Sequence, residues 1–379
     1  MTFATSIDGE FPADVYVITV GTPYEKGGVN LRSVERATRE VASKMRDGAL
    51  VILRSTVKLG TARNTVAPIL AATGKRFDLA VCPERTLEGK ALIELHQLPQ
   101  IIGADNAEVR SRCAQVFGAL THTTVAMSSL EAAELTKLVD NTFRDVSFAF
   151  ANEVAKLCSS AGLSAVEVIR AGRLGYPRTA VASPGPVGGP CLEKDPHILA
   201  ESASVYGVDM IITRAARLTN ENQPMESARL ISEIAISKGN FPDAPIITLA
   251  GLAFKGSPPT DDLRGTMAKP ILAGLRRAFP NAQYRGYDPL VEPDAARDYL
   301  GISSVKDLDA AFAGANIVVI ANNHPVFQSL DIAAQARNMA RPGIIYDFWN
   351  QHDDTQDAMP SDVVYTTLGT ERMGAILGH

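Results

Sequence analysis

Residues 49–57 read A-L-V-I-L-R-S-T-V, a continuous apolar run followed at once by one basic and two hydroxyl residues. Five apolar residues without alternation are typical of a strand buried on both faces. Similar runs cover 15–20 and 77–82, and a helical pattern from Leu31 to Met45 separates the first two strands. Strands that alternate with helices predict a parallel sheet covered on both faces, which is an α/β fold.

Small or polar residues follow each of these strands. Gly21 and Thr22 come after the first strand, Thr56 after the second and Glu84 after the third. Each alone has an ordinary alternative as a turn, a helix cap or a solvated loop carboxylate. Ligands of open parallel sheets bind beyond the carboxyl ends of the strands, so the repetition predicts a ligand site at this edge.

A long helix is predicted from Ser129 to Ala161, with Ser128 and Glu131 as a capping box and Gly162 at its end. Such a helix spans about 50 Å, more than one small domain needs. We expect it to link two domains and to bury an apolar face against a second subunit. The apolar residues at helical spacing are Leu135, Leu138, Val139, Val146, Phe150, Val154 and Leu157.

Residues 183–196 read S-P-G-P-V-G-G-P-C-L-E-K-D-P, a Gly- and Pro-rich loop that presents one thiol, Cys191. A cysteine nucleophile needs a lowered pKa or a nearby cation, which Lys194 or Lys137 could supply. Lys137 and Asn141 are four residues apart on one helix face, where an ammonium and an amide could hold an oxyanion. The alternatives are a buried structural cysteine and a solvated surface pair.

A second α/β unit begins after the loop around Asp243, and polar residues again follow its strands. Lys255 and Arg264 lie in the loop after its first strand, where they are candidates for phosphate contacts or ordinary solvated charges. The predicted strands are 246–249, 283–287, 317–320 and 344–346.

The composition is that of an ordinary globular protein: 379 residues, 46% hydrophobic, 21% charged, with a net charge of -5. No basic run indicates a nucleic-acid partner. The cysteines and histidines lack metal-ligand spacing, and no signal peptide or long apolar span is present, so we expect a cytoplasmic protein without a metal or membrane segment. The expected domains are a partial Rossmann-like domain (1–125), a central helical dimerisation domain with the cysteine loop (126–235) and a C-terminal ligand-binding α/β domain (236–379).

Taken together, these stretches resemble the UDP-glucose/GDP-mannose dehydrogenase family, and within it the bacterial UDP-N-acetylhexosamine 6-dehydrogenases. The resemblance covers nearly the whole chain in the family's order. Its segments are Arg54-Ser55-Thr56-Val57, Cys82-Pro83-Glu84-Arg85 with Glu88-Gly89, Glu134-Leu135-Thr136-Lys137-Leu138 with Asn141, Phe150-Ala151-Asn152-Glu153, Gly188-Gly189-Pro190-Cys191 with Lys194-Asp195, and Gly251-Leu252-Ala253-Phe254-Lys255 with Asp261-Asp262-Leu263-Arg264.

The resemblance implies that a UDP-sugar loses two hydrides in succession to two NAD molecules, which converts the alcohol at the sixth carbon into a carboxylate. Cys191 would attack the aldehyde intermediate, giving a thiohemiacetal that is oxidised to a thioester. Lys137 and Asn141 would hold the oxyanion.

The resemblance also implies the remaining roles and a homodimer through the long helix. An arginine after this helix would reach the partner's substrate, and Arg178 fits better than Arg173. Water and its protons would be handled by Glu84 and Asp195 with Thr56 nearby; substrate would be contacted by Glu84, Lys137, Asn141, Arg178, Gly188, Gly189, Phe254 and Lys255, and cofactor by Gly21, Thr22, Thr56, Glu88 and Arg264.

Two features depart from the family pattern. The family opens with a strand, a G-x-G-x-x-G turn, a helix and a strand that ends in an acidic residue, and none of these is found here. We therefore expect at least one βαβ unit of about 30 residues to be missing, a weakened NAD site and an uncovered sheet edge. The second departure is Pro186, where the family favours glycine and where proline removes a donor.

Three functions remain open. The first is a dehydrogenase whose missing half comes from another chain or was lost through a misplaced start. The second is an NAD-independent nucleotide-sugar enzyme, such as an epimerase or hydrolase. The third is a catalytically silent binding protein, which the complete set of five catalytic side chains argues against. Dehydrogenase function is the main prediction.

Overall fold

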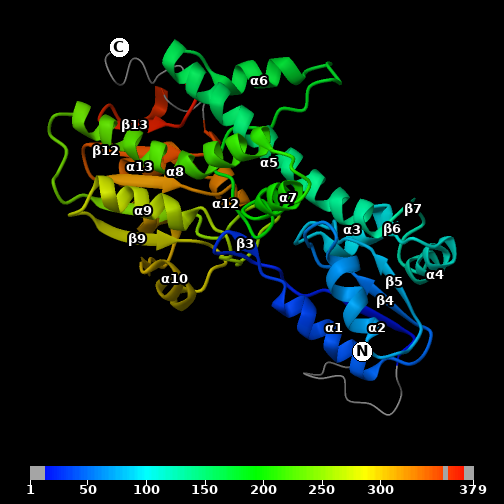
Figure 1. Ribbon diagram of the computed structural model, residues 1–379. Coiled ribbons are helices and arrows are strands. Elements are labelled where there is room, and N and C mark those ends of the chain that lie inside the picture. The colour runs from blue at the N-terminus through cyan, green and yellow to red at the C-terminus, as the bar shows by residue number, and fades with distance from the viewer. Residues whose placement is uncertain (1–12, 353–356, 371–379) are drawn as a thin grey trace. The chain divides into compact units, whose positions relative to one another are not determined.

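A computed structural model describes residues 13–352 and 357–370 of the chain. The chain divides into two compact units, residues 1–143 with 194–214 and residues 144–193 with 215–379. Two long helices, α5 (Leu130–Ala161) and α8 (Ile211–Ser237), each pass from one unit into the other (Figure 1).

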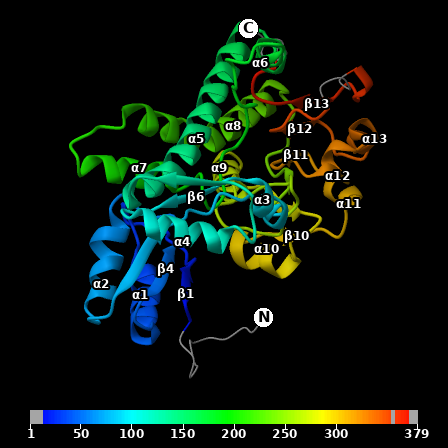
Figure 2. The same cartoon turned by 90° about the vertical axis from the view of Figure 1, so that its right-hand side faces the viewer.

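The sheet of the first unit has the order β1-β4-β5-β6-β7 and is covered on both faces. Alternate side chains of its fully buried strand β4 (Ala49–Leu53) enter two different clusters. Val51 packs with residues of α1 and α2, whereas Leu50 and Ile52 pack with residues of α4. Figure 2 shows these three helices beside the sheet. The other strands are β1 (Val15–Ile18), β5 (Phe77–Val81), β6 (Gln100–Gly103) and β7 (Thr124–Met127). The helices are α1 (Arg32–Lys44), a π-helix (Ala62–Val66) that continues into α2 (Ala67–Ala71), α3 (Ala91–Gln97), α4 (Ala107–Phe117) and α7 (Asp195–Ser204), with a hairpin of β2 (Tyr24–Glu25) and β3 (Gly28–Val29).

Two details of the predicted first unit are wrong. The sheet is not wholly parallel, because β5 and β6 pair antiparallel through Val81 and Gly103. Only the short helix α3 separates them, and its length of about 10 Å cannot return the chain to the opposite end of the sheet. The predicted capping residue of α5 is also displaced by one, since the Ser129 hydroxyl accepts the Ala132 N–H.

The sheet of the second unit is wholly parallel, with the order β10-β9-β8-β11-β12-β13. In sequence order this is the 3-2-1-4-5-6 arrangement of a Rossmann fold, whose direction reverses between β8 and β11. One face packs against α8, α9 and α10, and the other against α11, α12 and α13. The strands are β8 (Ile246–Ala250), β9 (Gln283–Tyr287), β10 (Ser303–Ser304), β11 (Ile317–Ile320), β12 (Gly343–Asp347) and β13 (Val363–Thr366). The helices are α6 (Ala165–Arg173), α9 (Ala268–Ala278), α10 (Pro293–Leu300), α11 (Leu308–Phe312), α12 (Pro325–Gln328) and α13 (Ile332–Arg337).

The connection after β8 distinguishes this unit from a dinucleotide-binding one. A dinucleotide fingerprint joins the first strand to the first helix by a short glycine turn. Here residues Gly251 to Met267 intervene before α9 begins, and they form a loop at the carboxyl end of the sheet. The predicted α/β fold is therefore confirmed in both units, and this loop lies where a parallel sheet binds its ligand. Among the described residues, no helix is both long and apolar enough to cross a membrane.

Candidate functional site

Cys191 lies in the second unit, in the loop between α6 and α7, and its side chain is exposed. The other three cysteines, Cys82, Cys113 and Cys158, are buried. The alternative of a buried structural cysteine at 191 is therefore wrong. An exposed thiol on a Gly- and Pro-rich loop is accessible to a substrate carbonyl.

Glycines lock the Cys191 loop onto the loop that follows β8. Gly189 has φ +92, and a Cβ added there would lie 2.6 Å from the ring of Phe254. Its N–H donates to the Gly265 carbonyl at 2.7 Å. A Cβ on Gly265, which has φ +62, would lie 2.8 Å from the Gly189 carbonyl carbon. Only glycine allows the two backbones to approach this closely, so the pair Gly188-Gly189 is required by packing.

The loop after β8 presents an aromatic ring and a cation at the switch point of the sheet. The Lys255 ammonium lies 5.0 Å from the centre of the Phe254 ring, a cation–π distance. Arg264 is 73% exposed and its guanidinium forks onto the carboxylate of Asp262. Burial raises the pKa of Asp262, but the hydrogen bonds and charge of Arg264 outweigh it and hold that pKa low. The Arg264 charge is thus balanced within its own loop.

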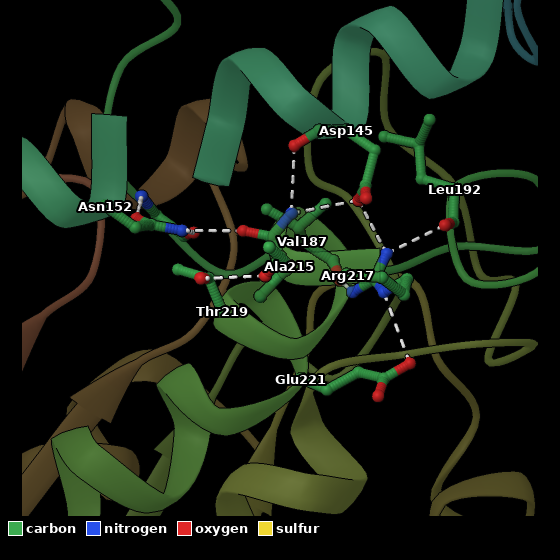
Figure 3. Close-up of polar contacts among 10 residues, drawn as sticks. Asp145, Asn152, Val187, Leu192, Ala215, Arg217, Thr219 and Glu221 are labelled. Atoms are coloured by element: carbon green, nitrogen blue, oxygen red, sulfur yellow. Dashed lines mark hydrogen bonds and ion pairs between the residues drawn. The ribbon is translucent and has the colours of Figure 1, made fainter. Parts of the chain in front are cut away.

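A buried polar network holds the other side of the Cys191 loop, and its members were not predicted as site residues (Figure 3). Arg217 on α8 donates to the carbonyl of Leu192 at 2.8 Å and to the carboxylate of Asp145 on α5 at 2.6 Å. Asn152, also on α5, makes two hydrogen bonds to the backbone of Gly185. In the sequence, these residues can be recognised only as polar side chains on otherwise apolar helix faces. That pattern does not identify their hydrogen-bond partners.

In the first unit, Asn141 and Asp195 meet as a buried pair. The Asn141 amide donates to Asp195 Oδ2 at 2.5 Å, and the Lys194 ammonium donates to Asp195 Oδ1 at 2.7 Å. Asp195 is fully buried at the start of α7. Lys194, one of two cations expected to activate the thiol, therefore pairs with a carboxylate. Lys137 is half-buried one turn before Asn141, and it makes no ion pair with another residue of the described part.

Glu84 follows β5 and is held by Arg54, which is almost completely buried at the end of β4. The guanidinium donates twice to Glu84 Oε2, at 2.9 and 2.5 Å, while Glu84 Oε1 accepts the backbone N–H groups of Arg85 and Thr86. Burial raises the pKa of Glu84, but the hydrogen bonds from Thr86 and Arg54 and the Arg54 charge outweigh burial and leave that pKa below its ordinary value.

The carboxyl ends of β1 and β4 fit the approach of a cofactor. The Thr22 hydroxyl donates to the backbone carbonyl of Thr56, and Ser55 donates to that of Val20, so the two strand ends are bonded together. A Cβ added to Gly21 would meet nothing within 4 Å, which leaves this edge open. Open space beside hydroxyl groups at the end of a parallel sheet suits a nucleotide.

The predicted contact residues Glu88 and Arg178 lie at the surface, as Arg264 does. Glu88 is exposed in the turn before α3. Arg178 is in the segment after α6, where its guanidinium lies 4.5 Å from the centre of the Tyr176 ring and its Nε donates to the Tyr176 hydroxyl. The location of Glu88 and Arg178 neither supports nor contradicts the contacts with cofactor and substrate that are predicted for them. Among the described residues, no group of three His, Cys, Asp or Glu side chains is placed to hold a metal ion.

Three family models match the chain in succession. The UDP-glucose/GDP-mannose dehydrogenase family NAD binding domain matches residues 1–121, the central domain residues 131–222, and the UDP binding domain residues 248–354. The first match supports NAD use, and the expectation of a weakened NAD site finds no support in it. The third match covers the loop with Phe254 and Lys255, which supports UDP-sugar binding.

The chain is also similar to named dehydrogenases along most of its length. It is 34% identical over 339 residues to the UDP-N-acetyl-D-mannosamine dehydrogenase of Pyrococcus horikoshii, covering 88% of this chain and 77% of that protein. The Escherichia coli K12 protein of the same name is 30% identical over 359 residues, covering 86% and 82%. Among solved structures, a P. horikoshii UDP-D-ManNAc dehydrogenase has a TM-score of 0.84 at 31% identity (95% and 82% covered), and a Pyrobaculum islandicum UDP-glucose dehydrogenase has 0.79 at 27% (94% and 80%).

Proposed function

Because the chain belongs to the UDP-glucose/GDP-mannose dehydrogenase family, we propose that it oxidises the primary alcohol at the sixth carbon of a UDP-N-acetylhexosamine to a carboxylate, with NAD as electron acceptor. UDP-N-acetylmannosamine is the first candidate substrate, since the P. horikoshii and E. coli relatives are named UDP-N-acetyl-D-mannosamine dehydrogenases. A structural neighbour named UDP-glucose dehydrogenase makes UDP-glucose the comparison substrate.

One observation carries this proposal: the exposed Cys191 lies on a loop that glycine packing locks against the Phe254 ring. Within the second unit, a nucleophile and a nucleotide-sugar contact are thereby held on two bonded loops. Phe254 and Lys255 would bind the UDP moiety at the switch point of the sheet. Cys191 would then meet the carbon that is oxidised.

In the proposed reaction the protein must stabilise the negative charge that develops on the carbonyl oxygen of the substrate. The Cys191 thiolate adds to the aldehyde carbon, and the former carbonyl oxygen becomes an oxyanion that Lys137 and Asn141 stabilise. Two oxidations need two two-electron acceptors, a role that NAD fills when bound. The Asp195 carboxylate orients the Asn141 amide. After the second oxidation has converted the thiohemiacetal to a thioester, water attacks the thioester carbon, Glu84 accepts a proton from this water, and the C–S bond breaks to release the carboxylate and the Cys191 thiolate.

NAD would lie at the carboxyl ends of β1 and β4, near Gly21, Thr22 and Thr56. Glu88 and Arg264 would contribute contacts from their loops. The low pKa of Glu84 keeps this carboxylate ionised, the form that a base requires. The division into 1–125, 126–235 and 236–379 stays a proposal, with the cysteine loop in the central part.

We further propose a homodimer that forms along α5, with Arg178 directed to the partner's substrate. Exposed apolar side chains on α5 support this proposal. A reducing compartment such as the cytoplasm suits the chain, because its four cysteines are all free.

Calorimetry on the full chain tests the ligands, and Cys191→Ser tests the mechanism. We expect both NAD and a UDP-N-acetylhexosamine to bind and NADH absorbance to appear. The Ser variant should lose at least about 1000-fold in kcat while its Kd for the sugar nucleotide stays within about threefold, because serine lacks a reactive thiolate. Sugar binding without NAD binding would instead indicate the NAD-independent enzyme. Binding of neither ligand would indicate a silent protein, and full turnover by the variant would remove the thiol from the mechanism.

A further inference from the structure

Arg217, Asp145, Asn220 and Asn152 form one buried network that contacts the backbone of the Cys191 loop. Figure 3 shows Arg217, Asp145 and Asn152 of this network. Arg217 is 4% exposed on its side chain, and the other three are fully buried. Asn220 donates to Asp145 Oδ1 at 2.9 Å and accepts from Asn152 at 3.1 Å. The network therefore connects α5 and α8 within the second unit.

The network contacts the loop at three backbone positions on both sides of the glycine pair. Arg217 Nη1 donates to the Leu192 carbonyl at 2.8 Å, and Nη2 points to the Val187 carbonyl at 3.4 Å. Asn152 donates to the Gly185 carbonyl at 3.1 Å and accepts its N–H at 2.9 Å. Leu192 directly follows Cys191, so the guanidinium orients the peptide next to the nucleophile.

Apolar packing alone does not hold this side of the loop. Val187 and Gly188 border a pocket of about 490 Å³, which Arg217 and Glu221 also line. A backbone that borders open space needs hydrogen bonds to keep a single position. Arg217 supplies them while its charge is balanced by Asp145 at 2.6 Å and by Glu221 at 3.3 Å.

A buried ion pair is a poor means of stabilising a fold, because desolvation of both charges offsets most of their attraction. A well-packed apolar pair would serve stability equally well. It could not donate to the carbonyls of Val187 and Leu192. The Arg217–Asp145 ion pair therefore contributes more to the position of the loop backbone than to the stability of the fold.

We propose that Arg217 is a positioning residue, which acts with Asp145 and Asn152 to hold the Cys191 thiol at the reacting carbon. The inference rests on the proposed function in one respect, the role of Cys191 as nucleophile. In this role Arg217 acts through the backbone of Val187 and Leu192.

The test compares Arg217→Lys with Arg229→Lys on the full chain. Lysine keeps the charge beside Asp145 but replaces the planar fork by one compact ammonium. Arg229 is the matched control, since it lies on the same helix, is 73% exposed and pairs with Glu233 one turn away. Two quantities are measured: the rate at which iodoacetamide alkylates Cys191, located by mass spectrometry, and the kcat and KM for the sugar nucleotide.

For Arg217→Lys we expect kcat to fall at least about tenfold with KM within about threefold, and the Cys191 alkylation rate to change at least about threefold. Arg229→Lys should match the wild type in each quantity. Asn152→Ser provides a second route, because it removes the Gly185 bonds but keeps the ion pair; a smaller kcat loss of about threefold is expected.

Wild-type kcat and alkylation rate in folded Arg217→Lys would overturn the inference, as would a KM rise equal to the kcat loss. If Arg217→Lys does not fold, Asn152→Ser decides by the same criteria. Alkylation is measured without substrate. A catalytically competent Cys191→Ser would therefore refute the proposed function while leaving the evidence on loop position intact.

Discussion

Among single residues, Arg54 directly controls a candidate catalytic group outside the cysteine loop, the Glu84 carboxylate. Its guanidinium is 8% exposed and donates to Glu84, to the Cys82 carbonyl and to the Gln100 side chain. A buried cation opposite a half-exposed carboxylate favours the ionised form of the acid. Arg54 thus keeps Glu84 able to accept a proton over most of the pH range.

Replacing Arg54 with Gln should raise the pKa of Glu84, because the Arg54 charge that counteracts the effect of burial is then removed. The acidic limb of the kcat/KM profile should move to higher pH, so that the activity loss is roughly threefold larger at pH 5 than at pH 8. The check is a pH–rate profile, with Glu84→Gln expected to abolish that limb. Arg76→Gln is the control, since Arg76 is 86% exposed and pairs with Asp47. Parallel profiles for wild type and Arg54→Gln would show that Glu84 does not titrate in catalysis.

At the scale of elements, Glu134 connects the start of α5 to the turn that begins the π-helix. Its carboxylate accepts the Gly60 N–H at 2.6 Å and the Ala62 N–H at 2.7 Å. Glu134 is 3% exposed. Burial raises its pKa to about 7, although the two backbone hydrogen bonds oppose the increase.

The raised pKa of Glu134 predicts a pH-dependent stability of the first unit. Between about pH 4.5 and 7 the folded state binds more protons than the unfolded state, so this contribution is present below pH 4.5 and is lost as the pH rises through 7. Over this range wild type should lose about 3 kcal/mol more unfolding free energy than Glu134→Gln. Denaturant unfolding at several pH values checks this, with the more exposed Glu233→Gln as control. Equal pH dependence in wild type and Glu134→Gln would contradict it.

The contact between the two loops of the second unit depends on Gly189. Gly189→Ala places a Cβ against the Phe254 ring on a backbone with φ +92. We expect a loss of about 2 kcal/mol in stability and an increase of about tenfold in KM, because Phe254 must move.

Gly175→Ala separates the two causes of this loss. Gly175 also has a positive φ, +68, but an added Cβ there meets nothing within 4 Å. It should show only the backbone strain of about 1 kcal/mol and an unchanged KM. Equal KM values for both variants would mean that Phe254 does not bind the substrate.

At the scale of the whole molecule, an exposed apolar stripe lies along α5. Val139, Phe143, Phe150 and Leu157 are 47%, 64%, 53% and 68% exposed. Their spacings of about four and seven residues place them on one face of the helix. An exposed apolar stripe of this kind is typical of a protein–protein contact.

The stripe predicts a dimer at micromolar concentration, measured by sedimentation. Phe150→Asp should weaken the association at least about tenfold, because a desolvated carboxylate replaces an aromatic contact. Leu92→Asp is the control, since Leu92 on α3 is 80% exposed and lies outside the stripe. A wild-type monomer would end the dimer proposal and leave Arg178 without a partner site.

The sequence alone determined the elements and the chemistry that they could carry. Continuous apolar runs such as Ala49–Leu53 and Ile317–Ile320 identified strands at the observed bounds, because the apolar pattern and the turn residues that end it are local properties. The segments around Cys191 and Phe254 indicated the family by their order along the chain. The residue that caps α5 is Ser129 and not the predicted Ser128, because a sequence pattern locates the end of a helix only to within one or two residues.

Only the tertiary structure decided which side chains meet. Nothing near Arg217 in the sequence indicates that it holds the backbone at Leu192, or that Arg54 holds Glu84. The antiparallel pairing of β5 and β6 was likewise invisible, because it follows from the short reach of α3. Hydrogen bonds between distant segments depend on where packed helices and strands bring them, and no periodicity in the chain encodes that position.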